Sequence, residues 1–198
     1  RDTGTPDVAT SPLVELENLL GAQITMASLG LGQYPVVAER YSIQQLRGRG
    51  ARGVVCRAHD LKLDRPVALK IYPPVEQESL LGEVAREARA LAKLEHPNVV
   101  RVHDFEAARI EGLSQPVNCL CLAMQFVEGV NLRTWLAEHS ASPEEVLKLV
   151  IDAGRGLVAA HEVGLVHRDF KPENVMVDGE ERARTVDFGL ARSSMGVD

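Results

Sequence analysis

The sequence predicts an α+β fold of two lobes, in which a β-rich lobe with one long helix precedes a mainly α-helical segment. Three observations predict it. Between residues 41 and 72, short runs rich in β-branched residues are separated by glycines, which is typical of an antiparallel sheet. Residues 78–93 carry apolar side chains at every third or fourth position, the spacing of one helix face. Past Asn131 the helical spacing takes over.

Residues 1–40 are expected to form a leader with one short amphipathic helix. Ser11 is a suitable N-cap, Pro12 suits the first helical position, and Gly21 is expected to stop the helix. The apolar face of this helix comprises Leu13, Leu16, Leu19 and Leu20. We expect that face to dock on another part of the protein.

The remaining elements divide the chain into a first lobe with its connection, residues 41–127, and a second lobe, residues 128–198. Strands are expected at residues 41–46, 53–60, 66–72, 99–105 and 118–127, with the helix of residues 78–93 ended by "HPN" at 96–98. In the second lobe, Ser142 and Glu145 form a capping box with Pro143 at the first helical position. The helix should continue to about His161, with an apolar stripe of Val146, Leu149, Val150, Ala153, Leu157 and Ala160.

Composition excludes several classes of protein. The chain has 198 residues, 45% hydrophobic and 25% charged, which is typical of a globular protein. Its net charge of -6 and scattered basic residues argue against nucleic acid as a partner. It contains no apolar run near the ~20 residues of a membrane helix. Cys56, Cys119 and Cys121 lack metal-site spacing and favour buried thiols in a reducing compartment. We therefore expect a cytoplasmic location, with any membrane anchor outside this segment.

A glycine motif at residues 48–53 indicates a phosphate-binding loop. Gly48, Gly50 and Gly53 follow the order GxGxxG, which alone is weak evidence. A dinucleotide-binding fold requires a helix directly after such glycines, whereas a strand is expected here. Glycines between two antiparallel strands let backbone N–H groups approach a phosphate. A strand, a glycine loop, a second strand and then "VALK" therefore predict a flap over a nucleotide.

Two charged residues fall at positions expected to be buried. Lys70 ends a strand that should be covered on both sides, and Glu87 lies on the core-facing stripe of the following helix. A buried charge without a partner is costly. We therefore expect an ion pair between Lys70 and Glu87.

The stretch "HRDFKPENVMVDGEERARTVDFG" places two aspartates in tight loops on either side of a short hairpin. The hairpin can bring Asp169 and Asp187 to one cleft although they are eighteen positions apart. With Asn174 they supply hard oxygen ligands that suit Mg²⁺, whose coordination a phosphate would complete. Phosphoryl transfer needs a metal to neutralise the triphosphate and a carboxylate to orient the attacking hydroxyl.

These elements occur in the order and with the spacing of a known family. From residue 41 to its end the chain resembles a eukaryotic-like, bacterial-type serine/threonine protein kinase domain, on the glycine motif, Val55, Lys70, Glu87, "HPN", "HRDFKPEN" and "DFG". Lys171 is typical of the serine/threonine subgroup. The resemblance implies a protein-kinase-like bilobal fold, with a β-rich N-lobe carrying one long helix and a partial, mainly α-helical C-lobe, truncated shortly after the DFG motif.

The resemblance also implies roles for the catalytic residues, with ATP and Mg²⁺ as cofactors. Asp169 would be the catalytic base and Lys171 would stabilise the transferred phosphoryl group. Asn174 and Asp187 would hold Mg²⁺. Lys70, positioned by Glu87, would contact the α- and β-phosphates of ATP.

Further residues would bind the rest of ATP. Val55, Ala68 and Met176 would sandwich the adenine ring, Met124 would be the gatekeeper, and Asn131 would contact the ribose. The complete ATP-binding set implied by the resemblance is Arg47, Gly48, Arg49, Gly50, Ala51, Arg52, Gly53, Val54, Val55, Ala68, Lys70, Met124, Gln125, Val127, Asn131 and Met176. His167, Phe188, Leu91 and Val102 match an apolar spine that links the lobes.

The chain also departs from the family pattern. Arg47 replaces the aliphatic residue that usually precedes the first glycine, and Arg52 replaces an aromatic residue or methionine. The chain ends at Asp198, before the segment that binds peptide substrates, so we expect these 198 residues alone to bind ATP weakly and to have little or no activity. Arg168 beside the catalytic aspartate indicates regulation by phosphorylation of the segment after "DFG".

The motifs are compatible with three functions. The first is a non-specific serine/threonine protein kinase, with ATP and protein substrates carrying Ser or Thr as partners. The second is a pseudokinase or nucleotide-binding interaction module. Lys70, Asp169 and Asp187, of which pseudokinases usually lose one, are all present. The third is a small-molecule kinase of the aminoglycoside or choline type, against which "HRDFKPEN" and "DFG" argue.

Overall fold

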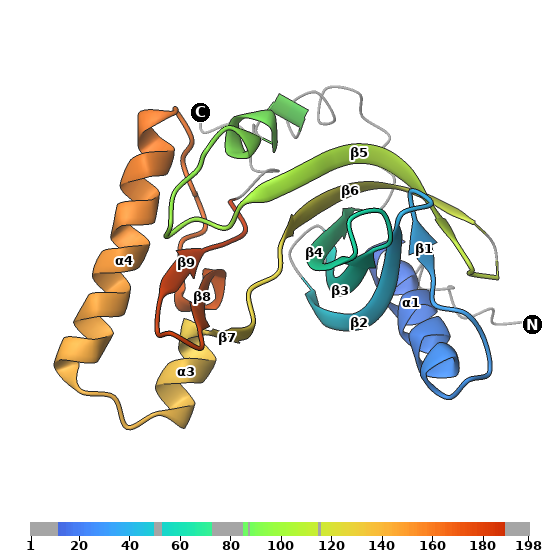
Figure 1. Ribbon diagram of the computed structural model, residues 1–198, viewed down its shortest axis with the longest axis horizontal. Helices are drawn as coiled ribbons and strands as arrows, with labels where there is room; N and C mark the ends of the chain where they lie inside the picture. The colour runs from blue at the N-terminus through green and yellow to red at the C-terminus, as the bar shows by residue number, and fades with distance from the viewer. Residues whose placement is uncertain (1–11, 50–52, 73–84, 87, 115, 189–198) are drawn as a thin grey trace, which may run out of the picture.

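Figure 1 shows a computed structural model of the chain, which describes residues 12–49, 53–72, 85–86, 88–114 and 116–188. A β-rich lobe at one end of the molecule is followed by a lobe that contains the long helix α4 (Pro143–Glu162) and a small sheet. The predicted α+β fold of two lobes is therefore confirmed.

The β-rich lobe is a closed barrel of antiparallel strands in the order β1-β2-β3-β4-β6-β5. The strands are β1 (Val36–Val37), β2 (Tyr41–Arg49), β3 (Val54–Asp60), β4 (Arg65–Tyr72), β5 (Val102–Glu111) and β6 (Val117–Gln125). The strands expected from residues 41, 53, 66 and 118 are present, and the one expected at 99–105 begins later and runs further. β1 was not predicted. It pairs with both β2 and β5 and so closes the barrel.

Alternation along the strands gives the barrel an inner and an outer face. On β4, Val67, Leu69 and Ile71 are fully buried inside the barrel, while Ala68 and Lys70 between them line a cleft on the other face. On β6, Cys119 and Cys121 share the inner face, and the prediction of buried thiols is confirmed because both lie in the barrel core. Burial raises the pKa of each thiol to about 12.

Helix α1 (Pro12–Ser28) packs beside the barrel and is longer than predicted. The prediction that Gly21 stops the helix is wrong, since the helix continues for seven residues beyond it. Gly21 lies 3.4 Å, measured from the position of an ideal Cβ, from Cδ1 of Leu46 on β2, so the small residue serves close packing. The helix ends instead before Gly30, whose φ of 73° is the left-handed conformation of a helix C-terminus.

The helix expected at residues 78–93 is present in its described part, where residues 85–86 and 88–92 are helical. Glu87 lies outside the described residues. Lys93 is already in a turn, which confirms the end predicted from "HPN". Among the described residues, no helix combines the length and the apolar character needed to cross a membrane.

The second lobe begins after a short connection that follows β6. It contains β7 (Gly129–Asn131), α3 (Leu132–Glu138), α4, the 3₁₀ turn η1 (Pro172–Asn174), β8 (Val175–Asp178) and β9 (Ala183–Thr185). The strands form a small antiparallel sheet in the order β7-β8-β9. The predicted hairpin between the two aspartate loops is therefore β8 and β9.

Helix α4 begins as predicted. The Ser142 side chain accepts from the backbone N–H of Glu145, and the Glu145 side chain accepts from the backbone N–H of Ser142, at 3.2 and 2.7 Å. Its buried residues are Leu149, Ala153, Gly156 and Ala160. The prediction that Val150 belongs to the core stripe is wrong, because Val150 is 48% exposed, beside the exposed Leu147, Ile151 and Val158. This face of α4 remains uncovered in the described chain.

Close packing of α4 fixes the segment that supports β9. A Cβ atom at Gly156 would collide with the carbonyl oxygen of Asn98. The backbone of Asn98 in turn accepts from the N–H of Thr185 at 2.8 Å, and its side-chain amide donates to Ala183 at 2.8 Å. The helix therefore positions the strand that leads into Asp187.

We expect Gly156→Ala to lower the free energy of unfolding by about 1–3 kcal/mol, because the added methyl group forces α4 away from Asn98. Gly154→Ala is the matched control on the same helix, where a Cβ would meet open space. It should raise stability by about 1 kcal/mol through helix propensity. Urea unfolding of both variants measures the difference. Equal stabilisation by the two alanine substitutions would contradict the close approach of Gly156 to the backbone of Asn98.

The carboxylate of Asp60, at the end of β3, is fully buried and holds neighbouring parts of the barrel together. Arg40 donates to both of its oxygens, at 2.9 and 2.7 Å, and the backbone N–H groups of Lys62 and Leu63 donate at 3.0 and 3.2 Å. The Arg40 hydrogen bond lowers the pKa of Asp60 to about 2, against the opposing effect of burial.

This low pKa predicts a loss of stability in acid. The unfolded chain binds the proton near the ordinary pKa of ~3.9, above the folded value. The stabilisation is therefore present above about pH 4 and is lost as the pH falls toward 2. Asp60→Asn should lower stability at pH 7 by about 1–3 kcal/mol, because Arg40 loses one partner but is 20% exposed and keeps its ion pair with Asp104, and should flatten the dependence between pH 4 and 2. Urea unfolding across this range tests it, with the exposed Asp64→Asn as control. An unchanged pH dependence in Asp60→Asn would refute the assignment.

Candidate active site

A cleft lies between the barrel and the second lobe, and residues of both line it. The lining residues are Arg47, Val55, Cys56, Ala68, Lys70, Val100, Met124, Gln125, Phe126, Val127, Met176, Val186 and Asp187. Most are apolar, and the charged groups are few. The cleft therefore suits a ligand with a flat apolar part and an ionic part.

Both lobes contribute to the apolar part of the cleft. Val55 and Ala68 come from the paired strands β3 and β4, and Ala68 lies opposite Met124 on β6. Met176 comes from β8 in the second lobe. A planar ring in this space would have aliphatic side chains from both lobes within reach.

The connection between the lobes adds an aromatic residue, Phe126. The guanidinium carbon of Arg47 lies 5.5 Å from the centroid of its ring, and that of Arg57 lies 5.0 Å away. Both distances are in the range of cation–π interaction. Arg47 thus lines the cleft beside Phe126, although an aliphatic residue was the family expectation at that position.

The ionic part of the cleft is an ion pair between Lys70 and Asp187. Lys70 is 7% exposed, and its Nζ donates to Oδ1 of Asp187. The two residues come from different lobes, so the pair joins the barrel to the loop after β9. Lys70 was predicted to pair with Glu87, on which the described residues give no information.

A second group of polar side chains lies in the loop that precedes η1. Lys171 donates from Nζ to Oδ2 of Asp169 at 2.8 Å, and Asn174 donates from Nδ2 to the backbone carbonyl of Asp169 at 2.9 Å. The hydrogen bond to Asp169 raises the pKa of Lys171, which keeps the ammonium charged. The loop thus presents a carboxylate, an ammonium and an amide within hydrogen-bonding reach of one another.

Val186 ties the two aspartate loops together. Its backbone N–H donates to the carbonyl oxygen of Asn174 at 2.9 Å, and its own carbonyl accepts from Nε2 of His167 at 2.9 Å. Burial lowers the pKa of His167, which favours the neutral ring that makes this donation. Asp187 follows directly with a φ of 56°, a conformation uncommon outside glycine. These contacts join the two predicted loops, and they place Asp187 in the lining of the cleft and Asp169 in the loop beside it.

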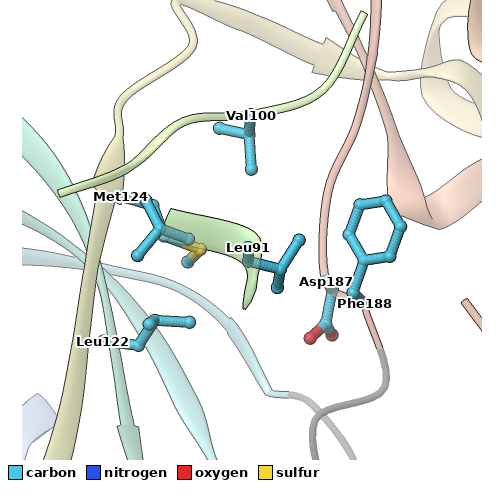
Figure 2. A pocket seen from close by; sticks show the side chains of 7 residues that line it. Leu91, Val100, Leu122, Met124, Asp187 and Phe188 are labelled. Atoms are coloured by element: carbon cyan, nitrogen blue, oxygen red, sulfur yellow. The ribbon is translucent and has the colours of Figure 1, made fainter. Parts of the chain in front are cut away.

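A small apolar cavity lies behind the ion pair. Figure 2 shows Leu91 between Met124 on one side and Phe188 on the other, with Asp187 below. The ring of Phe188 lies 4.8 Å from that of His167, centroid to centroid. Leu91, Val102 and Phe188 belong to one core cluster, so these members of the predicted spine are in mutual packing range. The spine links the helix that carries Leu91 to both loops.

The donor set fits a magnesium ion. The amide nitrogen of Asn174 donates to Asp169, which leaves its oxygen for a cation, and Lys70 pairs with Oδ1 of Asp187, which leaves Oδ2 as a second oxygen ligand. Mg²⁺ is commonly held by one or two such oxygens together with substrate phosphates.

The comparison with known proteins agrees with this geometry. Residues 41–196 match the protein kinase domain family. The chain belongs to the protein kinase family. The match covers the barrel from β2 onward and the whole described second lobe, and it begins after α1 and β1.

Relatives of this kinase domain are named serine/threonine kinases of bacteria. It is 37% identical over 167 residues to serine/threonine-protein kinase PkaB of Streptomyces coelicolor, 36% over 162 residues to serine/threonine-protein kinase pkn2 of Myxococcus xanthus, and 32% over 160 residues to PknB of Mycobacterium tuberculosis. Each alignment covers 79% of this chain but only 38%, 19% and 25% of the relative. The chain therefore spans less than two fifths of these relatives, and the resemblance to a bacterial-type serine/threonine kinase domain is confirmed.

The structure places the predicted kinase residues in three groups. Those that line the cleft are Arg47, Val55, Ala68, Lys70, Met124, Gln125, Val127, Met176 and Asp187. Those in the loop beside it are Asp169, Lys171 and Asn174. Gly50, Ala51, Arg52 and Glu87 lie outside the described residues.

Some residues that were predicted to contact ATP have structural roles in the fold. The side chain of Val54 is fully buried in the barrel core and so faces away from the cleft. Gly53 lies against the backbone of Ile71, where a Cβ would collide with the carbonyl oxygen. The side chain of Asn131 caps α3, accepting from the N–H of Thr134 at 2.8 Å. For Val54 and Gly53, only backbone groups could reach a nucleotide.

The resemblance implies a hinge at residues 125–127 that offers backbone groups to the adenine edge, and this range includes Phe126. Sequence reasoning assigned no place in the cleft to the side chains of Phe126, Cys56, Val100 or Val186. Val186 contributes through its backbone, which no residue pattern reveals. The stack of Arg47 on Phe126 depends on packing between strand β2 and the connection that follows β6.

Proposed function

We propose that the chain provides the nucleotide site and the catalytic loop of a serine/threonine protein kinase, which transfers the γ-phosphate of ATP to a Ser or Thr hydroxyl of a protein. One observation carries the proposal. The buried Lys70 forms an ion pair at the cleft with the partly exposed Asp187, and Val186 joins that pair to the loop of Asp169. A charged site of this kind, beside an apolar slot, suits a nucleoside triphosphate.

In the proposed complex, the adenine ring lies between Ala68 and Val55 of the barrel and Met176 of the second lobe. The backbone of residues 125–127 faces the ring edge. Lys70 then reaches the α- and β-phosphates, because it lies on the same strand as Ala68 and two residues further along the cleft face. Arg47, stacked on Phe126, covers the mouth of the slot.

The chemical step is an in-line displacement. Asp169 orients the Ser or Thr hydroxyl and accepts its proton, the hydroxyl oxygen forms a bond to the γ-phosphorus, and the bond from that phosphorus to the β–γ bridging oxygen breaks to release ADP. Lys171 stabilises the charge on the transferred group, because its ammonium is held beside the carboxylate at 2.8 Å.

Asn174 and Asp187 are the residues that would hold Mg²⁺. When bound, the ion neutralises charge on the triphosphate. The protein's own contribution is to fix both residues, through the hydrogen bonds of Asn174 to Asp169 and of Val186 to Asn174.

The domain boundaries remain part of this proposal. We assign residues 1–40 to a leader, 41–127 to the N-lobe and hinge, and 128–198 to part of the C-lobe. ATP and proteins carrying Ser or Thr are the proposed partners, nucleic acid is not, and the proposed location is the cytoplasm. Low activity of the 198 residues alone stays a prediction.

The test is phosphate transfer from γ-labelled ATP by the full-length protein, with Ser-, Thr- and Tyr-containing versions of one generic peptide. The proposal predicts Mg²⁺-dependent label on Ser or Thr and little on Tyr. ATP binding without transfer to any protein or peptide would favour the pseudokinase. Label on an amino sugar or choline alone would favour the small-molecule kinase.

A further inference from the structure

The elements outside the family match are built into the barrel. The match begins at residue 41, whereas α1 and β1 precede it. β1 nevertheless closes the barrel by pairing with β2 and β5. Figure 1 shows α1 beside β1 and β2. These elements are therefore an addition to the family domain that touches its glycine-bearing strand.

Helix α1 contacts β2 through buried leucines. Leu16 is 3% exposed and Leu20 is fully buried, and both belong to the same core cluster as Tyr41 and Ile43 of β2. Gly21, the residue after Leu20, allows Cδ1 of Leu46 to lie 3.4 Å from the position that a Cβ atom would occupy. The contacts between α1 and β2 therefore extend along β2 toward the glycine motif.

An ion pair extends this contact to the end of β2. Oε2 of Glu17 lies 3.6 Å from Nη1 of Arg49, the residue between the first two glycines of the motif. Arg49 is paired with Val54 in the last register position of the β2–β3 ladder. Glu17 therefore contacts the strand at the point where the glycine motif leaves the ladder.

A strand irregularity explains how one helix reaches both Leu46 and Arg49. Side chains three positions apart face opposite sides of a regular strand. The β2–β3 register shifts between Leu46 and Gly48, so one extra residue lies between them. An extra residue reverses the alternation, which brings Leu46 and Arg49 to the same side, toward α1.

We propose that α1 braces β2 and that Glu17 is a positioning residue, which holds the start of the glycine motif where it can bind the phosphates of a nucleotide. The inference rests on the proposed function. A preorganised loop binds its ligand more tightly because less ordering is left to the binding step. Adenosine, which has no phosphates, does not depend on the brace.

The test compares Glu17→Gln with Glu15→Gln in the full-length protein, since Glu15 is an exposed glutamate on the same helix. Dissociation constants are measured for ATP and for adenosine. We expect Glu17→Gln to weaken ATP binding by about two- to fivefold, the range of an exposed ion pair, and to leave adenosine binding unchanged. Glu15→Gln should change neither.

A second measurement does not depend on nucleotide. Hydrogen exchange of the amides of residues 46–49, without ligand, should be faster in Glu17→Gln and faster still in Leu20→Ala, with β4 and β6 unchanged in Glu17→Gln. Exchange at residues 46–49 that is unchanged in both variants would overturn the brace. Faster exchange with unchanged ATP affinity would overturn the positioning role. Failure of the wild-type protein to bind ATP would instead reject the proposed function, and the exchange result would still decide whether α1 braces β2.

Discussion

Replacing Asp169 by asparagine is expected to lower the rate of phosphoryl transfer by ~10²–10⁴-fold, the usual contribution of general acid–base catalysis. Asparagine has nearly the same shape but accepts no proton at neutral pH. The loop should keep its form, because Asn174 donates to the backbone carbonyl of Asp169 and the backbone N–H of Asp169 donates to His167 at 2.8 Å. ATP affinity should therefore change little.

Single-turnover transfer and ATP titration of Asp169→Asn separate the two effects. Asp64→Asn is a suitable control, since its carboxylate is 95% exposed in a turn of the barrel. A loss of ATP affinity as large as the loss of rate would assign Asp169 to nucleotide binding rather than to proton transfer.

Replacing Lys70 by methionine is expected to lower kcat/KM by ~10²–10³-fold, comparable to the loss of one charge-stabilising group in an active site. Methionine keeps most of the side-chain volume but removes the charge that pairs with Asp187 and reaches the phosphates. Asp187 would lose its partner but is 29% exposed, so water can solvate it in part. Stability should accordingly fall by less than the ~3–5 kcal/mol of a fully buried pair.

Lys62→Met, at an exposed position in the turn after β3, is the matched control. Comparison of kcat and KM for ATP in the two variants measures the effect, and thermal unfolding checks the fold. Full activity in Lys70→Met would show that the ion pair has no part in the mechanism and serves only to link the lobes.

Much of the fold and the site could be predicted because the deciding signals are local. Alternation along β4 separates Leu69 from Lys70, and the capping box at Ser142 marks the start of α4. The motifs around Asp169 and Asp187 place oxygen ligands on either side of a hairpin. Each of these signals depends on neighbours within a few residues.

The sequence-based predictions that were wrong concern positions where tertiary packing decides the structure. Gly21 has the residue type of a helix stop, yet its contact with Leu46 makes it a helix-interior residue. Val150 continues the apolar pattern of α4 but lies on a face that the described chain leaves uncovered. β1 consists of two residues, too few to form a pattern, and its pairing with β5 joins positions more than seventy residues apart.

The measurement that tests the account most directly is a crystal structure of the full-length protein with Mg²⁺ and a non-hydrolysable ATP analogue. The account predicts the adenine ring between Ala68 and Met176, Nζ of Lys70 against the α- and β-phosphates, and Mg²⁺ on oxygens of Asn174 and Asp187. The γ-phosphate should face Asp169. A nucleotide bound outside this cleft, or one whose γ-phosphate is directed away from Asp169 with no metal on Asp187, would contradict it.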